Sequence, residues 1–246
     1  KQKTAYEIYQ CDWSSDVCSS DLNSVKTYLA ANPQTIYNWG FLPGIDSDST
    51  DAEALFTLYN SYTSLQKFYL PVSAATYATW ATQSQLLNVF AFVQSPGANV
   101  STELDSVSFM QYMTAFNPSY TNKLPPSQYR YLSGVTAYSP LSQTLLNNFL
   151  AGNINFVATG AEGGISNTIL VAGKNLNGTP ANVAYSIDWT QININLAVSN
   201  AVINGSNNTL NPLYYTQDGI NALQQVASTV GVQAIQAGLA LGQVVD

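Results

Sequence analysis

Short apolar runs alternate with helical stretches through the first half of the chain. The run over Leu86–Val93 is the clearest, because it is continuously apolar and ends at the turn residues Ser95, Pro96 and Gly97. A helix is predicted from Ser73, where the sequence is rich in alanine and threonine. This alternation predicts an α/β fold with a mainly parallel or mixed sheet flanked by helices. The strand-like runs lie at 35–41, 67–72, 86–93 and 108–116.

The second half of the chain is predicted to be rich in strands before it ends in helices. Among the strand-like runs, one helix is expected to begin at Pro140, because proline suits the first helical position, and to stop at Gly152. A turn is predicted at 175–178. The strand-like runs of this half lie at 129–138, 154–160, 168–173 and 181–187.

The pattern from Asp188 to Gly205 fits two structures. Ile192, Ile194, Leu196 and Val198 alternate as in a strand, whereas Trp189, Ile192, Leu196 and Ile203 follow the spacing of a helix. Asp188 is a favourable N-cap and Gly205 a favourable stop, which favours the helix. A last helix is predicted within 216–238, where apolar residues again recur at helical spacing.

Four acidic residues between the first two strand-like runs invite a calcium-site interpretation. An EF-hand loop needs glycine at its sixth position and glutamate at its twelfth, and counting from Asp46 these places hold Asp51 and Thr57. Thr50 and Glu53 instead have the spacing of a capping box ahead of an apolar run. We therefore expect a helix start and no metal site. The four acids are Asp46, Asp48, Asp51 and Glu53.

The first 22 residues have no usable hydrophobic period. Reverse translation of Lys1–Glu7 and Cys11–Asp21 resembles the two constant parts of a short-read sequencing adapter, in one frame and in order, separated by an index-sized gap. We therefore interpret 1–22 as a non-native segment and exclude it from fold reasoning. The remaining chain is expected to comprise an N-terminal α/β part, 23–120, and a C-terminal part, 121–246.

Charge and composition exclude several functions for residues 23–246. This part contains neither His nor Cys, so it has no Ser-His-Asp or Cys-His catalysis, no disulfide and no zinc spacing. Five basic and ten acidic residues give a net charge of −5, without the basic stripe that nucleic-acid binding requires. No apolar run is long enough to span a membrane. So few charges suit a subunit whose surface is largely covered by neighbours.

No catalytic constellation emerges from the sequence. Glu162, before Gly163 and Gly164, could be an acid on a flexible loop, but glycoside cleavage needs a second carboxylate and none is identifiable. The same stretch lacks the Lys-Ser/Thr ending of a phosphate-binding loop. Many tyrosines could form a sugar-stacking surface, an interface or core. They are Tyr59, Tyr62, Tyr69, Tyr77, Tyr112, Tyr120, Tyr129, Tyr131, Tyr138, Tyr185, Tyr214 and Tyr215.

From Leu124 onward, the order of motifs resembles the contractile tail sheath proteins of phages. Leu150, Asn153 and Asn155 nearly match a Leu-x-x-x-Asn-x-Asn pattern that precedes an aromatic strand in that family. Asp188-Trp189 then resembles the family's helix opening, although Tyr185-Ser186-Ile187 stands where the family usually has a basic residue. The other matching stretches from Leu124 onward are 125–140, 146–160 and 211–227. Before Leu124, the chain resembles the family only in its alternation of strands and helices and at 113–118.

The resemblance implies a sheath-like core and a structural role without catalysis, cofactor or metal. Sheath subunits form a helical lattice around the tail tube protein in the virion, after synthesis in the cytoplasm of the bacterial host. Their terminal arms add strands to sheets of neighbouring subunits. On this resemblance, the chain is expected to be truncated before the C-terminal arm. The alternative is an adhesin or carbohydrate-binding surface protein, which the tyrosines, asparagines and low charge also fit.

Overall fold

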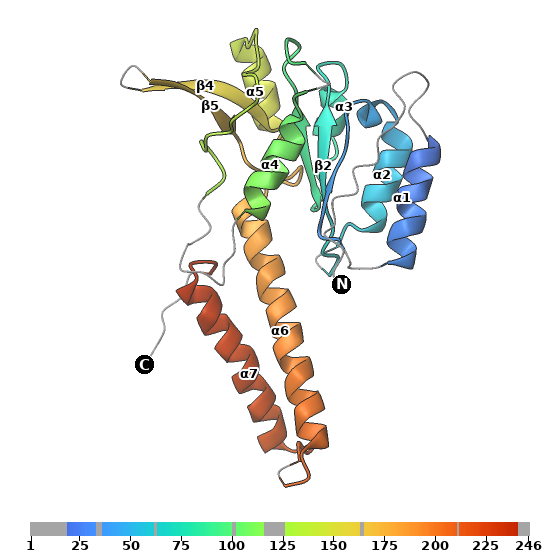
Figure 1. Ribbon diagram of the computed structural model, residues 1–246, viewed down its shortest axis with the longest axis vertical. Helices are drawn as coiled ribbons and strands as arrows, with labels where there is room; N and C mark the ends of the chain where they lie inside the picture. Colours follow the sequence, from blue (N-terminus) through green and yellow to red (C-terminus); the bar gives the residue numbers. More distant parts are fainter. Residues whose placement is uncertain are drawn as a thin grey trace. The chain divides into compact units, whose positions relative to one another are not determined.

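The chain folds into two compact units, each described here by itself. The first comprises 1–114 and 126–180, and the second comprises 115–125 and 181–246. The fold is α/β, as the alternation of apolar runs predicts (Figure 1). The computed structural model describes residues 19–32, 36–61, 63–99, 102–115, 126–162, 165–210 and 212–240.

A three-stranded parallel sheet forms the centre of the first unit. Its strands are β1 (Asn38–Gly40), β2 (Lys67–Val72) and β3 (Val89–Val93), in that order. The predicted strand at 67–72 is confirmed residue for residue, while the other two are shorter than the runs that predicted them. Every residue of β2 and β3 is buried, as expected for parallel strands covered on both faces.

Aromatic side chains pack against both faces of this sheet. On one face, Phe68 lies 4.9 Å, between ring centroids, from Phe56 of α2 (Ser49–Leu58). On the other face, Tyr69 lies 5.7 Å from Phe109 of α4 (Asp105–Thr114). In Figure 1, α4 crosses the sheet on one face, and α1 and α2 lie side by side on the other. The sheet therefore has two apolar layers.

The helix α1 (Ser19–Ala31) begins within the segment interpreted from its sequence as non-native. Its Leu22 and Leu29 are each 1% exposed and belong to the main apolar core. Residues 1–18, with both cysteines, lie outside the described residues.

Two helix starts differ from their predictions, and at one of them a side-chain cap acts at another residue. The capping box at Thr50 does not form: Asp48 is the N-cap of α2, and its carboxylate accepts from Asp51 N at 3.4 Å. The helix predicted from Ser73 is α3 (Tyr77–Ala81), which begins four residues later. A short helix, η1 (Ile45–Ser47), precedes α2.

The helix predicted from Pro140 is α5 (Gln143–Ala151), which begins three residues later. Ser142 is its N-cap and accepts from Leu145 N at 3.2 Å. The predicted stop at Gly152 is confirmed. A Cβ at Gly152 would lie 2.4 Å from the Cβ of Ala81, so close packing requires glycine there.

The strand predicted at 108–116 is wrong, because α4 occupies this part of the chain up to Thr114. Phe109 and Met113, one helical turn apart, are both buried. Residues 116–125, with Tyr120, lie outside the described residues.

The strands β4 (Phe156–Glu162) and β5 (Ile165–Val171) form an antiparallel hairpin, which confirms the two predicted runs and extends them toward each other. No strand forms at 129–138, where Tyr131 makes only an isolated bridge to Ile169. The backbone there instead follows the outer edge of β5 through bonds such as Tyr129 N to Leu170 O, at 2.8 Å. The turn predicted at 175–178 is confirmed by the bond from Gly178 N to Asn175 O.

The described part of the second unit consists of two helices, α6 (Ala181–Asn207) and α7 (Gln217–Gln236). The helical interpretation from Asp188 is confirmed, but α6 begins seven residues before Asp188 and ends two residues beyond Gly205. The strand predicted at 181–187 is therefore wrong, and the second half is less rich in strands than expected. Across the described ranges of both units, no helix is long and apolar enough to cross a membrane.

Candidate functional site

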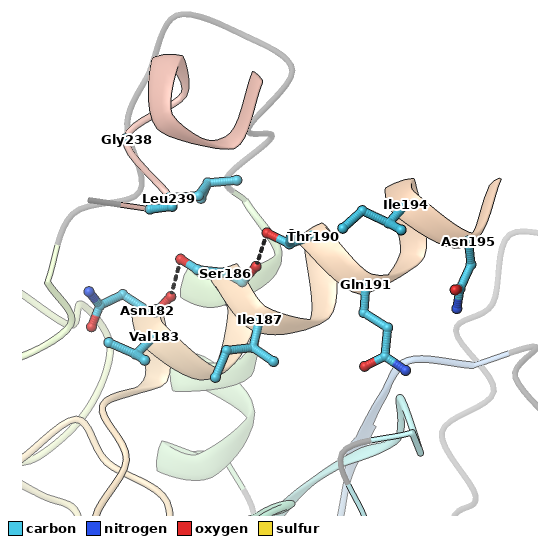
Figure 2. A pocket seen from close by; sticks show the side chains of 11 residues that line it. Asn182, Val183, Ser186, Ile187, Thr190, Gln191, Ile194, Asn195, Gly238 and Leu239 are labelled. Atoms are coloured by element: carbon cyan, nitrogen blue, oxygen red, sulfur yellow. Dashed lines mark hydrogen bonds between the residues drawn. The ribbon is translucent and has the colours of Figure 1, made fainter. Parts of the chain in front are cut away.

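An apolar groove lies at the open end of the α6–α7 hairpin. It encloses about 750 Å³ between the first half of α6 and the residues that follow α7. Figure 2 shows Leu239 opposite Ser186 and Thr190 across this groove. Val183 and Ile187 contribute side chains that are 41% and 40% exposed. We call this feature the α6 groove.

Polar side chains also line the α6 groove: the hydroxyls of Ser186 and Thr190, and the amides of Asn182, Gln191 and Asn195. Ser186 Oγ donates to Asn182 O at 2.7 Å, and Thr190 Oγ1 donates to Ser186 O at 2.8 Å (Figure 2). Both hydroxyl protons therefore bond to the backbone of their own helix. The exposed lining is mainly carbon and contains no charged group, and the amides of Asn182, Gln191 and Asn195 supply its remaining polar atoms.

A second apolar surface follows the opposite side of α6. Ile192, Leu196 and Ile203 are 39%, 57% and 58% exposed. At 3.6 residues per turn they share one stripe, which lies about 180° around the helix from the stripe of Val183 and Ile187. We call this surface the α6 ridge.

The sequence of this helical hairpin is almost without charge. Between residues 181 and 240 the only ionisable acids are Asp188 and Asp218, and there is no Lys or Arg. Asp188 is only 4% exposed. The groove and the ridge are therefore suited to a neutral, apolar partner.

The outer edge of β4 is partly open. Val157 O of β4 accepts from Tyr138 N at 2.8 Å, so Val157 turns its backbone groups away from β5. By the alternation of an antiparallel ladder, Thr159 and Ala161 do the same. No hydrogen bond to their outward backbone groups comes from any residue that the structure describes.

The acidic cluster is used for structure. Asp46 is 5% exposed, and its carboxylate accepts from Ser73 N at 2.8 Å and from the Thr76 hydroxyl. Glu53 accepts from Gln83 Nε2 at 2.9 Å. Within the described ranges, no group of three or more His, Cys, Asp or Glu side chains could hold a metal ion.

Glu162 forms the end of β4, where its backbone pairs with Ile165. Gly163 and Gly164 lie outside the described residues. No second carboxylate is brought to Glu162 by the pairing of β4 with β5, whose partner residues are Ile165–Val171.

The structure reveals a buried carboxyl group that sequence reasoning missed. Asp105, in the first turn of α4, is 3% exposed, and neither carboxyl oxygen has a hydrogen-bond partner in the described part of the chain. Burial first, and then the negative charge of Glu103, raises the pKa of Asp105 to about 7. Glu103 itself accepts from Thr136 N at 2.9 Å.

The asparagines of the family-like pattern have structural roles. Asn155 is fully buried: its Nδ2 donates to Ala91 O at 3.0 Å and to Lys174 O at 2.7 Å, and its Oδ1 accepts from Lys174 N. Asn153 has a φ of 54°, a left-handed conformation that asparagine tolerates, and it donates to Leu176 O at 3.1 Å. These residues connect β3, β4 and the turn before α6.

The described tyrosines differ widely in exposure. Tyr69 and Tyr138 are buried, whereas Tyr129 and Tyr131 are 63% and 69% exposed beside β5. In the second unit, Tyr214 and Tyr215 are exposed between α6 and α7. Tyr62 lies outside the described residues.

Neither protein-family models nor curated protein sequences give a match to this chain.

Proposed function

We propose that this chain is a structural virion protein: a subunit of a phage contractile tail sheath that polymerises around the tail tube and links its neighbours by strand exchange. One observation carries the proposal. The α6–α7 hairpin has apolar side chains on two opposite sides of α6 that a single copy leaves exposed. Exposed apolar surfaces of this kind are typical of proteins that bind other proteins. The order of motifs from Leu124 onward, which resembles that of tail sheath proteins, is the reason for proposing a tail sheath as the assembly.

The low charge of the chain supports a surface that many neighbours cover. Charged residues make up 9% of the sequence, against about 25% in an ordinary globular domain. Subunits of the same sequence that pack closely would repel one another if they carried many like charges. The uncharged α6 groove and α6 ridge avoid this cost.

Strand exchange requires an accepting edge, and β4 offers one. The outward backbone groups of Thr159 and Ala161 could pair with an extended segment of a neighbouring subunit. Natural proteins usually block such edges with Pro or Lys, and neither residue occurs in β4. Links of this type would hold while subunits turn and slide as nearly rigid bodies during contraction.

Electron microscopy of the expressed reading frame that contains this chain tests the proposal. Tubes of constant diameter are expected, because a head-to-tail contact that does not close on itself generates a helical array. A protein that forms no tubes, with or without the tail tube protein of the same phage, would contradict it.

A carbohydrate-binding surface protein is the second candidate. Its support is the exposed pair Tyr129 and Tyr131, since tyrosine rings can stack against sugars while their hydroxyls stay solvated. A glycan array separates the two functions. Specific glycan binding that is lost in Tyr131→Ala, without tube formation, would favour this candidate over the sheath.

A further inference from the structure

We propose that the α6 ridge of one copy of this chain inserts into the α6 groove of the next copy. The ridge comprises Ile192, Leu196 and Ile203, and the groove contains Val183, Ile187 and Leu239. This proposal rests on the proposed function. It adds the contact through which neighbouring subunits would stack.

The two surfaces match in length. The apolar positions of the groove extend on α6 from Val183 to Ile194, and those of the ridge extend from Ile192 to Ile203. Each stripe spans eleven residue steps, or about 16 Å of helix. A convex stripe and a concave stripe of equal length are thus present on one helix.

The two surfaces also match in chemistry. The exposed lining of the groove is mainly carbon, with uncharged amides at its margins, and the hydroxyls of Ser186 and Thr190 donate to their own helix. The ridge presents branched aliphatic side chains, and no basic residue occurs between positions 181 and 240. A nucleic acid or an anionic lipid would find no positive charge here. A second copy brings a neutral apolar ridge, which is the partner that this groove fits.

The position of the surfaces determines the kind of assembly. Because the ridge and the groove lie about 180° apart around α6, one copy cannot use both surfaces on the same partner. When the ridge of one copy binds the groove of the next, the resulting chain of copies has a free groove at one end and a free ridge at the other. Such a heterologous contact adds further copies without closing, as a filament requires.

Sedimentation velocity of the purified full chain, over a range of concentrations, tests this contact. We expect concentration-dependent association of the wild type. Leu196→Lys removes the ridge and Ile187→Lys removes the groove, and each should weaken association about tenfold or more, equivalent to ~1.4 kcal/mol. Asn204→Lys is the matched control: it adds the same charge to an exposed position of α6 away from both stripes, and should associate as the wild type does.

Mixing the two variants distinguishes this contact from a symmetric one. Leu196→Lys retains its groove and Ile187→Lys retains its ridge, so an equimolar mixture should form particles of two chains that grow no further. A mixture that stays monomeric would overturn the front-to-back contact, as would variants that associate like the wild type. Circular dichroism of each variant verifies that the helices are intact.

A monomeric wild type at the highest concentration would also overturn the proposal. If Leu196→Lys then lowered the unfolding temperature, the ridge would be covered by another part of the same chain. These results can be distinguished from a failure of the proposed sheath function. Copies could associate through α6 without forming tubes, which would contradict only the sheath function. Tubes could also form through the edge of β4 while both variants associate like the wild type, which would contradict only the α6 contact.

Discussion

A Cβ atom at Gly219 would lie 2.0 Å from the carbonyl oxygen of Tyr214. Gly219 is in the first turn of α7, and its N–H bonds to Thr216 Oγ1 at 3.4 Å. The backbone of the loop between α6 and α7 thus packs directly against the start of α7. This close approach positions the second helix of the hairpin beside the first.

We therefore expect Gly219→Ala to destabilise the hairpin by about 1–3 kcal/mol, because backbone atoms must shift to admit the methyl group. Gly231→Ala is the matched control in the same helix, since nothing lies within 4 Å of its added Cβ. Alanine there should stabilise the helix by roughly 0.5–1 kcal/mol. Thermal unfolding followed by circular dichroism measures both changes. Equal effects of the two substitutions would contradict the close packing at Gly219.

The buried carboxyl of Asp105 should make the stability of the first unit depend on pH. The pKa of Asp105 is about 7 in the folded protein and 3.8 in an unperturbed chain. Between pH 3.8 and pH 7, the folded state therefore holds the proton more tightly than the unfolded state does. The contribution of Asp105 to stability is therefore fully present at low pH and is lost as pH rises through 7, by on the order of 4 kcal/mol.

Asp105→Asn keeps the shape of the side chain and removes its charge. Urea unfolding of both proteins between pH 5 and pH 8 measures the effect. The variant should be more stable than the wild type at pH 8, and its stability should change less across this range. Parallel pH profiles for the two proteins would show that Asp105 ionises in the folded protein as it does in water.

Asn155 should be essential for the first unit. Its side chain makes three hydrogen bonds, to Ala91 O, Lys174 O and Lys174 N, while fully buried. In Asn155→Ala these buried backbone groups lose their side-chain partner, at a cost of about 1–3 kcal/mol for each group left unsatisfied.

Asn147→Ala is a suitable control for Asn155→Ala, because the Asn147 side chain accepts from Gln143 Nε2 on the surface of α5 and is exposed. It should change the free energy of unfolding by less than about 0.5 kcal/mol. Denaturant unfolding compares the two variants. A small effect of Asn155→Ala would contradict the role of this side chain in joining β3 to β4.

Two strands of the sheet, β2 and β3, were predictable from sequence because they are buried on both faces. The run from Lys67 to Val72 contains only one charged residue, and all six of its positions are buried. Such a run requires no alternation and is recognisable by composition. The helix α4 was misread for a related reason: its short aromatic and methionine-rich run fits a strand equally well.

The surfaces on α6 could be predicted only in part. The spacing of Ile192, Leu196 and Ile203 is visible in the sequence, and it predicts one stripe of a helix. Which stripe α7 covers depends on tertiary packing, which no local pattern encodes. The burial of Asp105 is similar, because a carboxylate in the first turn of a helix is ordinarily a surface residue.

Immunogold electron microscopy of the virions that carry this protein tests the central claim most directly. An antibody raised against the purified chain is applied to intact and contracted particles. The sheath assignment predicts label along the whole length of the tail, over a shorter and wider structure after contraction. Label confined to the tail tip, to the capsid or to the bacterial surface would contradict it.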